Sequence, residues 1–578
     1  MKNCKTAQRQ KIIFCFFMVC ILTIGLLCRL AYLMLYKAEY YGKKAIDVQQ
    51  RERHIKAERG IIYDRNGDVL AGNKPVSTIS VIHNQITDPE KVISTLSGIL
   101  DIPEEKVRKR VEKVSSIEKI KSNVDKEISD KIRDMGLDGV MVDEDYKRYY
   151  PYGNLASKVI GFTGADNQGI IGLEVSYDKY LQGIDGRILT MTNARGIEIA
   201  GKAEERIEPV EGAGLYTSID INLQKYATQL AEDVLISKNA KSVRIIMMNP
   251  SNGEIYTVVN APEFNLNEPY ALSNSEGMTE KEINDTLNQM WRNNCVSDTY
   301  EPGSTFKVIT ATAALEEKVV KVDDTFNCPG YKIVEDRRIR CHKVSGHGAE
   351  TFVQGVQNSC NPVFMEVGAR LGVEGMYKYL DQFRVLKKTG IDVPGEAATI
   401  IHKKENVGAV ELATMSFGQS FQLTPVRLLS TVSSIINGGK AIVPHFAVKA
   451  KDSSSDSQIE FEYDSGDEIV SNDTSQTMKM ILETVVSEGG GKKAAVDGYL
   501  VGAKTGTSEK LPRSSNKYVA SCLGFAPADN PVVLAIVLID EPEGVYYGGT
   551  IAAPVISKLL DNALPYLGVE RKSYKDKK

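Results

Sequence analysis

Ser304 and Lys307 form a pair of residues whose types and spacing could do chemistry. They follow the turn residues Pro302 and Gly303 and precede an apolar run over residues 308–315. A separation of three at the start of a helix places both side chains on one side of its first turn. A serine hydroxyl becomes a useful nucleophile when a neighbouring group removes its proton. The pair is therefore a candidate nucleophile and base.

Spacing alone does not single out this pair, because Ser-x-x-Lys recurs in the chain. The same pattern occurs at Ser116/Lys119, Ser176/Lys179 and Ser514/Lys517. The Pro-Gly turn before Ser304, the apolar helix after it and polar partners downstream must distinguish it. The candidate partners are the segments Ser359-Cys360-Asn361 and Lys504-Thr505-Gly506-Thr507.

A second Lys-Thr-Gly copy lies at residues 388–390 and competes with the later one. Ile391-Asp392-Val393-Pro394-Gly395 follows it, which predicts a loop. The later copy is predicted to lie on a strand, and Thr507 gives it a fourth residue able to donate hydrogen bonds. We therefore expect the later copy to belong to the site.

Length and composition predict a globular protein of several domains. The chain has 578 residues, of which 42% are hydrophobic and 25% charged, and this length favours two to four domains. The net charge of -4 gives no basic footprint, and no zinc-finger or RNA-binding motif occurs. We therefore expect no nucleic-acid partner.

The N-terminal residues predict a membrane anchor. Basic residues in 1–11 precede an uncharged run over 12–28, which continues past Arg29 to residue 36. A helix of this length can cross a hydrocarbon core of ~30 Å. A cleaved signal peptide is the alternative, but no small-x-small cleavage pattern occurs near the end of the apolar run. We expect an uncleaved single-pass anchor over 12–36, with residues 1–11 in the cytoplasm and the catalytic domain outside the cell membrane.

Composition changes along the exported part predict two regions and a tail. Residues 37–210 combine a charged helical stretch, short strands around an Asn-Gly turn and a helical lobe over 87–143, and form an N-terminal pedestal. A mixed domain is expected over 211–569, with antiparallel strands near 501–507, 518–525 and 532–539. Residues 570–578 form a charged tail.

The motifs together resemble those of class B penicillin-binding proteins, the monofunctional peptidoglycan transpeptidases. The resemblance covers most of residues 55–565 in the family's order, and Asn249 departs from it where the family commonly has Asp. It is closest to the sporulation-specific branch, the stage V sporulation protein D type, through Cys-Pro-Gly at 328–330 and Asn358 to Pro362. The other matching segments are Arg59-Gly60-x-Ile62-x-Asp64-Arg65-x-Gly67, Gly172-Leu173-Glu174, Tyr300-Glu301-Pro302-Gly303-Ser304, Gly346-His347-Gly348 and Gly418-Gln419-Ser420.

The resemblance implies an α+β transpeptidase fold, an antiparallel sheet flanked by helices, with an elongated dimerisation-like pedestal and a single transmembrane helix. It also implies the chemistry: Ser304 attacks the penultimate D-alanine carbonyl of a stem peptide, and an amine of a second stem peptide resolves the acyl-enzyme into a cross-link. The activity would serve spore-cortex synthesis. β-Lactams would acylate the same serine.

The resemblance further assigns roles to the motif residues. Lys307 would act as base once burial, the cation of Lys504 and the positive helix end lower its pKa. Backbone N–H groups of Ser304 and Thr507 would hold the oxyanion. Ser359 would relay a proton and Asn361 would bind the substrate amide. The terminal carboxylate of the substrate would bind Lys504, Thr505 and Thr507. Gly506 lies between the two threonines and would also contact the substrate.

Acyl transfer of this kind requires no cofactor, yet the chain carries a candidate structural zinc site. Cys328, Cys341, His347 and Cys360 are types that suit a closed tetrahedral site. Relatives with zinc beside the catalytic cleft support this interpretation. Two alternatives remain: a Cys328–Cys341 disulfide, or three free buried cysteines with His342 as the accessible imidazole. Five cysteines follow the anchor, an odd number that excludes a fully paired framework.

Two rival functions fit the same residues. One is a β-lactam sensor or β-lactamase on the same fold. The other is a non-catalytic scaffold whose pedestal recruits a polytopic glycan polymerase, a partner that a transpeptidase could also have. The expected partners are therefore stem peptides, β-lactams, the membrane and such a polymerase. A glycosyltransferase activity is not expected, because the region before Ser304 carries no lipid-processing motif.

Overall fold

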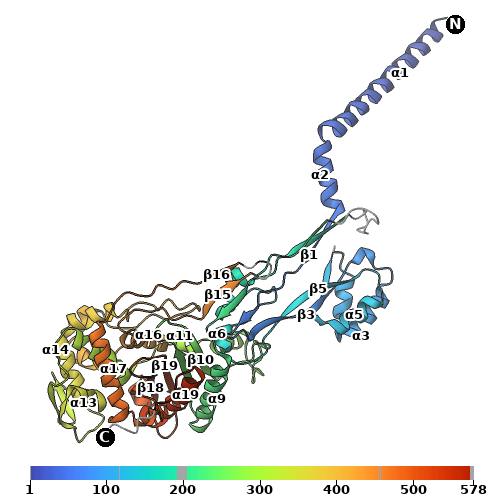
Figure 1. Ribbon diagram of the computed structural model, residues 1–578. Helices are drawn as coiled ribbons and strands as arrows, with labels where there is room; N and C mark the ends of the chain where they lie inside the picture. The colour runs from blue at the N-terminus through green and yellow to red at the C-terminus, as the bar shows by residue number, and fades with distance from the viewer. Residues whose placement is uncertain (1, 116, 192–204, 453–454, 456, 573–578) are drawn as a thin grey trace. The chain divides into compact units, whose positions relative to one another are not determined.

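The computed structural model describes residues 2–115, 117–191, 205–452, 455 and 457–572 (Figure 1). The chain forms two compact units. The first comprises residues 1–58, 74–147 and 184–210, and the second comprises 59–73, 148–183 and 211–578. Ser116 of one Ser-x-x-Lys copy and residues 573–578 of the predicted tail lie outside the described residues.

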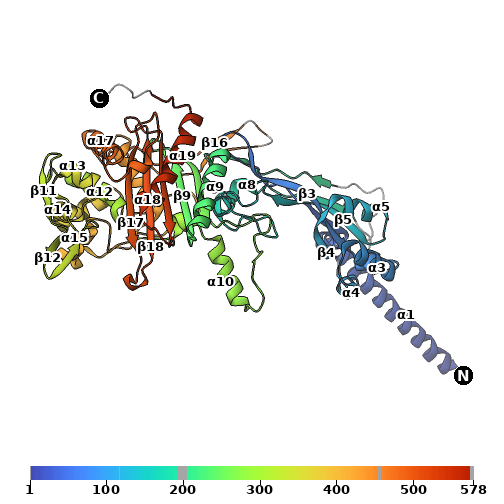
Figure 2. The same cartoon turned by 90° about the horizontal axis from the view of Figure 1, so that it is seen from below.

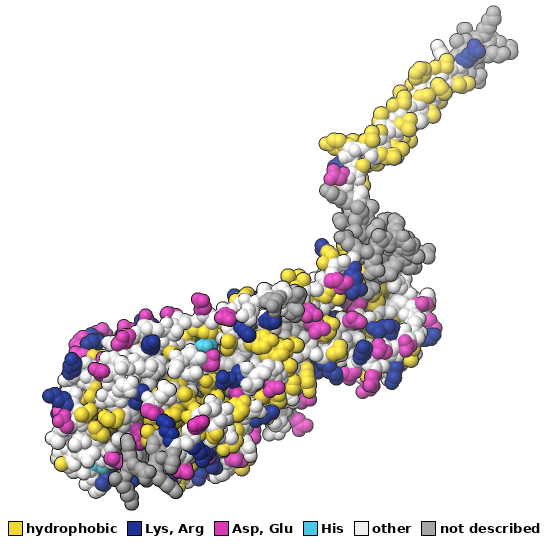
Figure 3. Space-filling model, viewed as in Figure 1, with side chains coloured by type: hydrophobic (Ala, Val, Ile, Leu, Met, Phe, Trp, Pro, Cys, Tyr) yellow, Lys and Arg dark blue, Asp and Glu magenta, His cyan; other side chains and the backbone are white. Residues whose placement is uncertain are grey.

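The first unit begins with the predicted apolar helix. α1 spans Lys2–Ala31, a π-helical turn η1 follows over Tyr32–Tyr36, and α2 spans Ala38–Gln49. The stretch Arg9–Tyr36 has 28 residues and a mean hydropathy of 2.6. Figure 3 shows it covered with apolar side chains. It is long and apolar enough to cross a membrane.

The remainder of the first unit contains both strands and helices. Residues 87–143 were expected to be helical, but they also form strands: along β4 (Glu118–Asp125) exposed residues alternate with buried or half-buried ones, which is the period of a strand. Helices α3 (Pro89–Leu100), α4 (Glu104–Val111) and α5 (Lys126–Asp134) share a core with these strands. β4 and β5 (Val140–Tyr149) both pair with β3 (Val69–Val81), and a separate three-stranded sheet contains β1 (Gln50–Ile55), β6 (Gly186–Met191) and β7 (Glu205–Ile207).

The second unit contains a five-stranded antiparallel sheet. Its order is β10-β9-β19-β18-β17, which places β17 at an edge. β19 lies in the middle of the sheet and all of its residues are buried. The strands span Ser242–Met248 (β9), Ile255–Ala261 (β10), Gly502–Glu509 (β17), Tyr518–Ala526 (β18) and Val533–Asp540 (β19).

Helices cover both faces of this sheet (Figure 2). α9 (Ile221–Ser237) and α19 (Ala553–Tyr566) pack on the face that carries Ile245 and Val537. The opposite face carries Ile246 and Leu538 and packs on four other helices. These are α12 (Lys307–Glu316), α14 (Asn361–Gln382), α16 (Pro425–Ile436) and α17 (Asn472–Ser487). This arrangement is the α+β fold predicted from the sequence.

Shorter elements complete the second unit. β11 (Thr325–Cys328) pairs with β14 (Gly348–Thr351), and β12 (Tyr331–Val334) pairs with β13 (Arg337–Arg340). β16 (Gln458–Glu460), β15 (Ala447–Lys451), β8 (Gly214–Thr217) and β2 (Ile62–Tyr63) pair in this order, and β2 also pairs with the start of β3 through Ile62 and Ala71. The short helices are α6 (Ser157–Ile160), α7 (Gly172–Ser176), α8 (Asp178–Leu181), α10 (Glu280–Trp291), α11 (Asn294–Ser297), α13 (Phe352–Gln357), α15 (Ala409–Met415) and α18 (Gly548–Ile551).

A buried ion network explains two of the motifs found in the first half of the chain. Arg59 Nε lies 2.6 Å from Glu174 Oε2, and Arg148 Nε lies 2.7 Å from Glu174 Oε1. All three side chains are almost fully buried. A buried carboxylate is tolerated only when it is paired and hydrogen-bonded. The two arginines therefore fix the Gly172-Leu173-Glu174 segment against residues 59–73.

Candidate active site

The nucleophile turn begins at Pro302 and leads into α12. Residues Gly303–Phe306 form a 3₁₀ turn, and Lys307 is the first residue of the α-helix. Gly303 has φ +55°, a value that favours glycine. Thr305 Oγ1 donates to the Pro302 carbonyl over 2.7 Å. Ser304 stays partly exposed, whereas Gly303 and Thr305 are buried. The turn thus presents one serine hydroxyl from a rigid support.

A second loop, which contains Gly418, contacts this turn directly. Gly303 N–H donates to the Gly418 carbonyl over 2.8 Å. Gly418 has φ +87°, and a Cβ there would lie 2.1 Å from Gly303 O. Only glycine allows this approach. The motif Gly418-Gln419-Ser420, found from resemblance alone, therefore supports the position of the nucleophile turn.

Glu301 is a functional-site residue whose role the sequence did not reveal. Its buried carboxylate accepts the Ser420 N–H at 3.0 Å and two bonds from Arg513 Nη2 at 2.8 and 3.1 Å. Arg513 lies in the loop between β17 and β18. Glu301 thereby joins the nucleophile turn to two other loops. The signal available was a charged residue inside an otherwise turn-forming segment.

Lys307 lies buried beneath the nucleophile turn. Its Nζ donates to the Ser359 carbonyl at 2.6 Å and to Asn361 Oδ1 at 2.8 Å, and it lies 3.3 Å from Ser359 Oγ. Burial lowers the pKa of Lys307 to about 8, although the acidic groups of Cys360, Cys341 and Glu350 act in the opposite direction. A lysine with such a pKa can serve as a base near neutral pH.

The middle motif lies between α13 and α14. Ser359 has φ +52° in the left-handed region, which directs its backbone carbonyl to Lys307. Cys360 caps the N-terminus of α14, and Asn361 is the first residue of that helix. Asn361 Nδ2 donates to the Arg340 carbonyl over 3.1 Å. The amide is thus oriented on both sides, with its oxygen toward the lysine.

β17 supplies the third motif at the edge of the sheet. Lys504 is fully buried, and its Nζ donates to Ser359 Oγ at 2.9 Å. Burial and the nearby Lys307 cation lower the pKa of Lys504 well below its ordinary value. The sequence predicted that burial, the Lys504 cation and the helix end would lower the pKa of Lys307; of these three causes, burial is the one found in the structure.

Thr505 and Thr507 alternate with buried neighbours along β17. Both are partly exposed, while Gly506 between them is buried. A Cβ at Gly506 would lie 2.6 Å from Ser521 Oγ. Thr507 Oγ1 accepts the Gly548 N–H over 3.1 Å. The edge strand therefore presents two threonines beside the lysine pair, at a place where an extended substrate could add as a strand.

The structure brings three of the motif copies together and leaves the other described copies apart from them. The three segments around Ser304, Ser359 and Lys504 converge, which singles out Ser304/Lys307 among the four spacings. The earlier Lys-Thr-Gly at 388–390 has no regular secondary structure, as predicted, and its Thr389 N–H binds Glu396.

Cys328, Cys341, His347 and Cys360 lie together as the sequence suggested. One ligand atom from each lies within 4.8 Å of the others. Bonds of ~2.3 Å in a tetrahedral site place sulfur ligands about 3.8 Å apart, so a small contraction would close the site around zinc. The three cysteines are buried and His347 is partly buried. The donor set therefore fits a structural zinc ion.

The surroundings of this cluster bear on the two alternatives. Cys328 and Cys341 both carry free thiols. His342 is exposed, whereas the His347 side chain is only 8% exposed. Glu350 Oε1 is buried, has no hydrogen-bond partner among the described residues and lies 3.8 Å from His347 Nδ1. A carboxylate beside a metal-binding imidazole commonly orients it, and the position of Glu350 therefore favours His347 as the imidazole ligand of the metal.

Comparisons with known proteins agree with this geometry. Residues 243–561 match the penicillin binding protein transpeptidase domain, and residues 54–217 match the penicillin-binding protein dimerisation domain. Stage V sporulation protein D of Bacillus subtilis is 37% identical, with 100% of this chain and 89% of that protein covered. Peptidoglycan D,D-transpeptidase FtsI of Escherichia coli is 27% identical, with 94% and 90% covered.

Solved structures share the fold. A peptidoglycan synthetase from Bifidobacterium adolescentis superposes with a TM-score of 0.73 at 22% identity, covering 92% of this chain and 99% of that one. Penicillin Binding Protein 2X from Streptococcus thermophilus gives a TM-score of 0.72 at 21% identity, with 89% and 80% covered. With the sequence matches over the whole chain, these findings show that the chain belongs to the class B penicillin-binding proteins.

Proposed function

We propose that this chain is a peptidoglycan D,D-transpeptidase that cross-links stem peptides through an acyl-enzyme on Ser304. The observation that carries the proposal is the convergence of Lys307 and Lys504 on Ser359, beside the partly exposed Ser304 turn. Relatives along the whole chain are named peptidoglycan D,D-transpeptidases, and one is a sporulation protein. The proposed setting is spore-cortex synthesis, and β-lactams are proposed to acylate the same serine.

The acylation step follows from the positions of these groups. Ser304 Oγ attacks the penultimate D-alanine carbonyl, and neutral Lys307 takes its proton. Backbone N–H groups of Ser304 and Thr507 are proposed to stabilise the oxyanion, a contribution of ~10²–10³ in rate. Ser359 passes a proton to the leaving D-alanine nitrogen, since its hydroxyl contacts both lysines.

Residues beside Ser304 and Lys307 are proposed to bind the substrate. The terminal carboxylate is proposed to bind Lys504, Thr505 and Thr507, and the backbone of Gly506 allows the peptide to lie close to β17. Asn361 is proposed to bind the substrate amide. Its side chain already bridges Lys307 and the Arg340 carbonyl, so it is held in place before substrate arrives.

Acyl transfer itself needs no cofactor, and the proposed zinc ion is structural. The ion would be held by Cys328, Cys341, His347 and Cys360. When bound, it would link β11, β14 and the start of α14 to one another. Because Cys360 lies between Ser359 and Asn361, the metal would fix the middle motif without contacting substrate.

The membrane topology and a partner are also proposals. The apolar segment Arg9–Tyr36 is proposed to anchor the chain in the cell membrane, with the basic N-terminus in the cytoplasm and the catalytic part outside. Residues 37–210 are proposed as the pedestal and 211–569 as the catalytic domain. The pedestal is proposed to contact a polytopic glycan polymerase, which would supply the strands to be cross-linked.

Labelling with a fluorescent penicillin tests the function. The full-length chain in detergent should form a stable covalent adduct that peptide mapping places on Ser304, and Ser304→Ala should abolish it. Ser514→Ala, which removes the serine of another Ser-x-x-Lys copy, is the matched control and should label normally. An adduct on another serine, or rapid turnover of penicillin, would contradict the proposal.

A further inference from the structure

A large groove lies in the second unit, outside the three motifs. Its volume is about 1500 Å³, more than the ~300–1,000 Å³ typical of sites for small molecules. Residues of α10, of the segment around α11 and of the β17–β18 hairpin line it. Figure 2 shows α10 and that hairpin projecting on the same side of the sheet. We call this cavity the α10 groove; it has room for several residues of a peptide.

One end of the α10 groove meets the nucleophile turn. Tyr300 and Glu301 line it, and Glu301 precedes Ser304 by three residues. Ser508, which follows Thr507 on β17, also lines it. A Cβ on Gly303 would lie 2.6 Å from Ser508 Oγ, so the groove wall and the turn are in contact. A ligand at this end of the groove would therefore lie beside the turn that carries Ser304.

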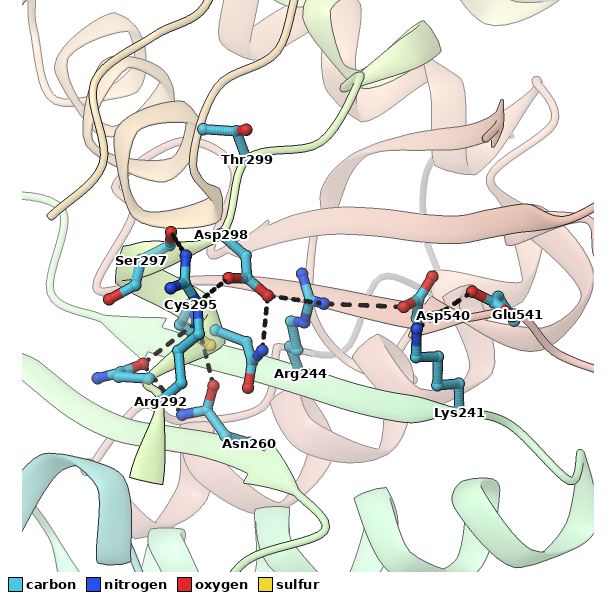
Figure 4. Close-up of polar contacts among 12 residues, drawn as sticks. Lys241, Arg244, Asn260, Arg292, Cys295, Ser297, Asp298, Thr299, Asp540 and Glu541 are labelled. Atoms are coloured by element: carbon cyan, nitrogen blue, oxygen red, sulfur yellow. Dashed lines mark hydrogen bonds and ion pairs between the residues drawn. The ribbon is translucent and has the colours of Figure 1, made fainter. Parts of the chain in front are cut away.

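Arg244 lines the groove between Asp298 and Asp540, with which its guanidinium forms two long ion pairs (Figure 4). Arg244 is 9% exposed, and its Nε is buried without a hydrogen-bond partner in the described part of the chain. Its Nη2 lies 3.7 Å from Asp298 Oδ2 and 3.8 Å from Asp540 Oδ2, both beyond hydrogen-bond distance. Buried donors are normally satisfied, so the site calls for a polar ligand.

The two neighbouring carboxylates already have closer partners. Asp298 accepts from Asn294 Nδ2 at 2.6 Å and pairs with Arg292. Asp540 accepts from Lys510 Nζ at 2.8 Å. Arg244 Nε is therefore an unused donor on the floor among the described residues, and a guanidinium matches a carboxylate in geometry and charge.

Two hydroxyls extend this polar floor toward the nucleophile. Tyr300 Oη and Ser508 Oγ are buried and lack hydrogen-bond partners among the described residues. Side chains of both charge signs line the rest of the groove, namely Lys241, Arg292, Lys510, Glu509, Asp298 and Asp540. Mixed charge of this kind suits a ligand that carries both carboxylates and an amine, and does not suit a polyanion.

We propose that the α10 groove binds the acceptor stem peptide of the transpeptidation, with a carboxylate of that peptide on Arg244. This inference rests on the proposed function and names the second substrate's site. The peptide's amine nitrogen attacks the acyl-Ser304 carbonyl, the new C–N bond forms, the ester C–O bond breaks, and Ser304 Oγ regains a proton released by the amine. The groove thereby orients the nucleophile of the second step.

Partition of the acyl-enzyme tests the proposal with full-length chain in detergent. An acyl-D-alanyl thioester acts as donor, and the ratio of aminolysis to hydrolysis is measured with two acceptors. One acceptor is a stem peptide with a free amine and free carboxylates; the other is glycinamide, too small to reach Arg244. Arg244→Gln should lower the ratio about tenfold for the peptide, the loss typical of one charge-assisted hydrogen bond, and leave it unchanged for glycinamide.

A matched variant and a matched ligand complete the test. Arg384→Gln, which removes an arginine paired with Asp467 outside the groove, should leave both ratios unchanged. With the unmutated chain, a peptide whose carboxylates are amidated should show the same fall in the aminolysis ratio. This comparison does not depend on whether the Arg244 variant folds. An unchanged ratio in both comparisons, or equal loss for both acceptors, would overturn the groove assignment while penicillin labelling of Ser304 persists. Absence of that labelling in the unmutated chain would overturn the proposed function as well.

Discussion

Lys504 Nζ donates a hydrogen bond to Ser359 Oγ over 2.9 Å, and Lys307 Nζ lies 3.3 Å from the same oxygen. Two buried lysines thus share one hydroxyl. Like charges at such separations disfavour the doubly protonated state, so one lysine of the pair loses its proton more readily than a solvated lysine. The middle motif therefore connects the other two motifs and gives protons a route between them.

Acylation by a labelled penicillin should accelerate as pH rises through about 8. Lys307 accepts the serine proton only when it is neutral, and burial lowers its pKa to about 8. Well below that pH the neutral fraction falls about tenfold per pH unit, and above it the rate should level off. Stopped-flow acylation rates between about pH 6 and about pH 9 measure this. A rate independent of pH across the range would contradict the role of Lys307.

Asn361→Asp should move that profile to higher pH. Asn361 Oδ1 accepts from Lys307 Nζ at 2.8 Å, and a carboxylate at the same place would stabilise the ammonium form and raise the pKa of Lys307. Acylation near neutral pH should then fall about tenfold for each pH unit by which the midpoint rises. Asn361→Ala, which adds no charge, is the control and should lower the rate without moving the midpoint upward. Coincident midpoints for the two variants would contradict the explanation.

Sequence patterns predicted the strand and helix positions of the motifs because each carries its own local signal. The turn before Ser304, the apolar helix after it and the strand at Lys504 follow from glycine, proline and hydrophobic periodicity. The loop at 388–390 was predicted for the same reason. Convergence of three segments separated by dozens of residues has no such local signal, and only family resemblance anticipated it.

Other parts of the site depend on contacts that no local pattern encodes. Glu301 and Arg513 are more than two hundred residues apart in the sequence. Nothing in the sequence around either residue indicates that the two side chains form an ion pair. Arg244 lies within a buried strand, where sequence predicts an apolar core residue. The strands β4 and β5 were missed because their lysines and glutamates favour helices, while burial of one face against α3–α5 overrides that preference.

Gly418→Ala should impair acylation far more than its effect on overall stability would suggest. A Cβ there would lie 2.1 Å from Gly303 O, so the nucleophile turn must shift, and a displacement of this kind costs about a hundredfold in rate. Gly568→Ala is the matched control: it also has positive φ, but no atom of the described residues lies within 4 Å of its added Cβ. Both variants should lose about 1 kcal/mol from backbone strain. Penicillin acylation and thermal unfolding of the pair separate the two effects, and equal acylation rates would contradict the role of Gly418.

His347→Ala should abolish zinc binding and lower the thermal midpoint, whereas His342→Ala should do neither. His347 belongs to the four-residue cluster and His342 is its exposed neighbour. Removing one ligand of a closed tetrahedral site weakens the site and the fold that it supports. Elemental analysis of chain purified under reducing conditions should give about one zinc per chain before mutation. Zinc far below that level, or equal loss in both variants, would sink the assignment.

Arg513→Gln should slow acylation by loosening the turn that carries Ser304. Arg513 is the ion-pair partner of Glu301, whose side chain is 7% exposed, and its removal leaves that carboxylate with the Ser420 N–H alone. An uncompensated buried group costs about 1–3 kcal/mol. The double variant Glu301→Gln/Arg513→Gln removes the charge together with its partner and should recover part of that stability.

Arg384→Gln provides the comparison for the Glu301–Arg513 pair. Arg384 pairs with Asp467, whose side chain is 71% exposed, so its loss should change stability by well under about 1 kcal/mol. Denaturant unfolding of these three variants and their penicillin acylation rates compare the two ion pairs. If Arg513→Gln proves as harmless as Arg384→Gln in both measurements, then the loop between β17 and β18 does not hold the nucleophile turn, and Glu301 acts through Ser420 alone.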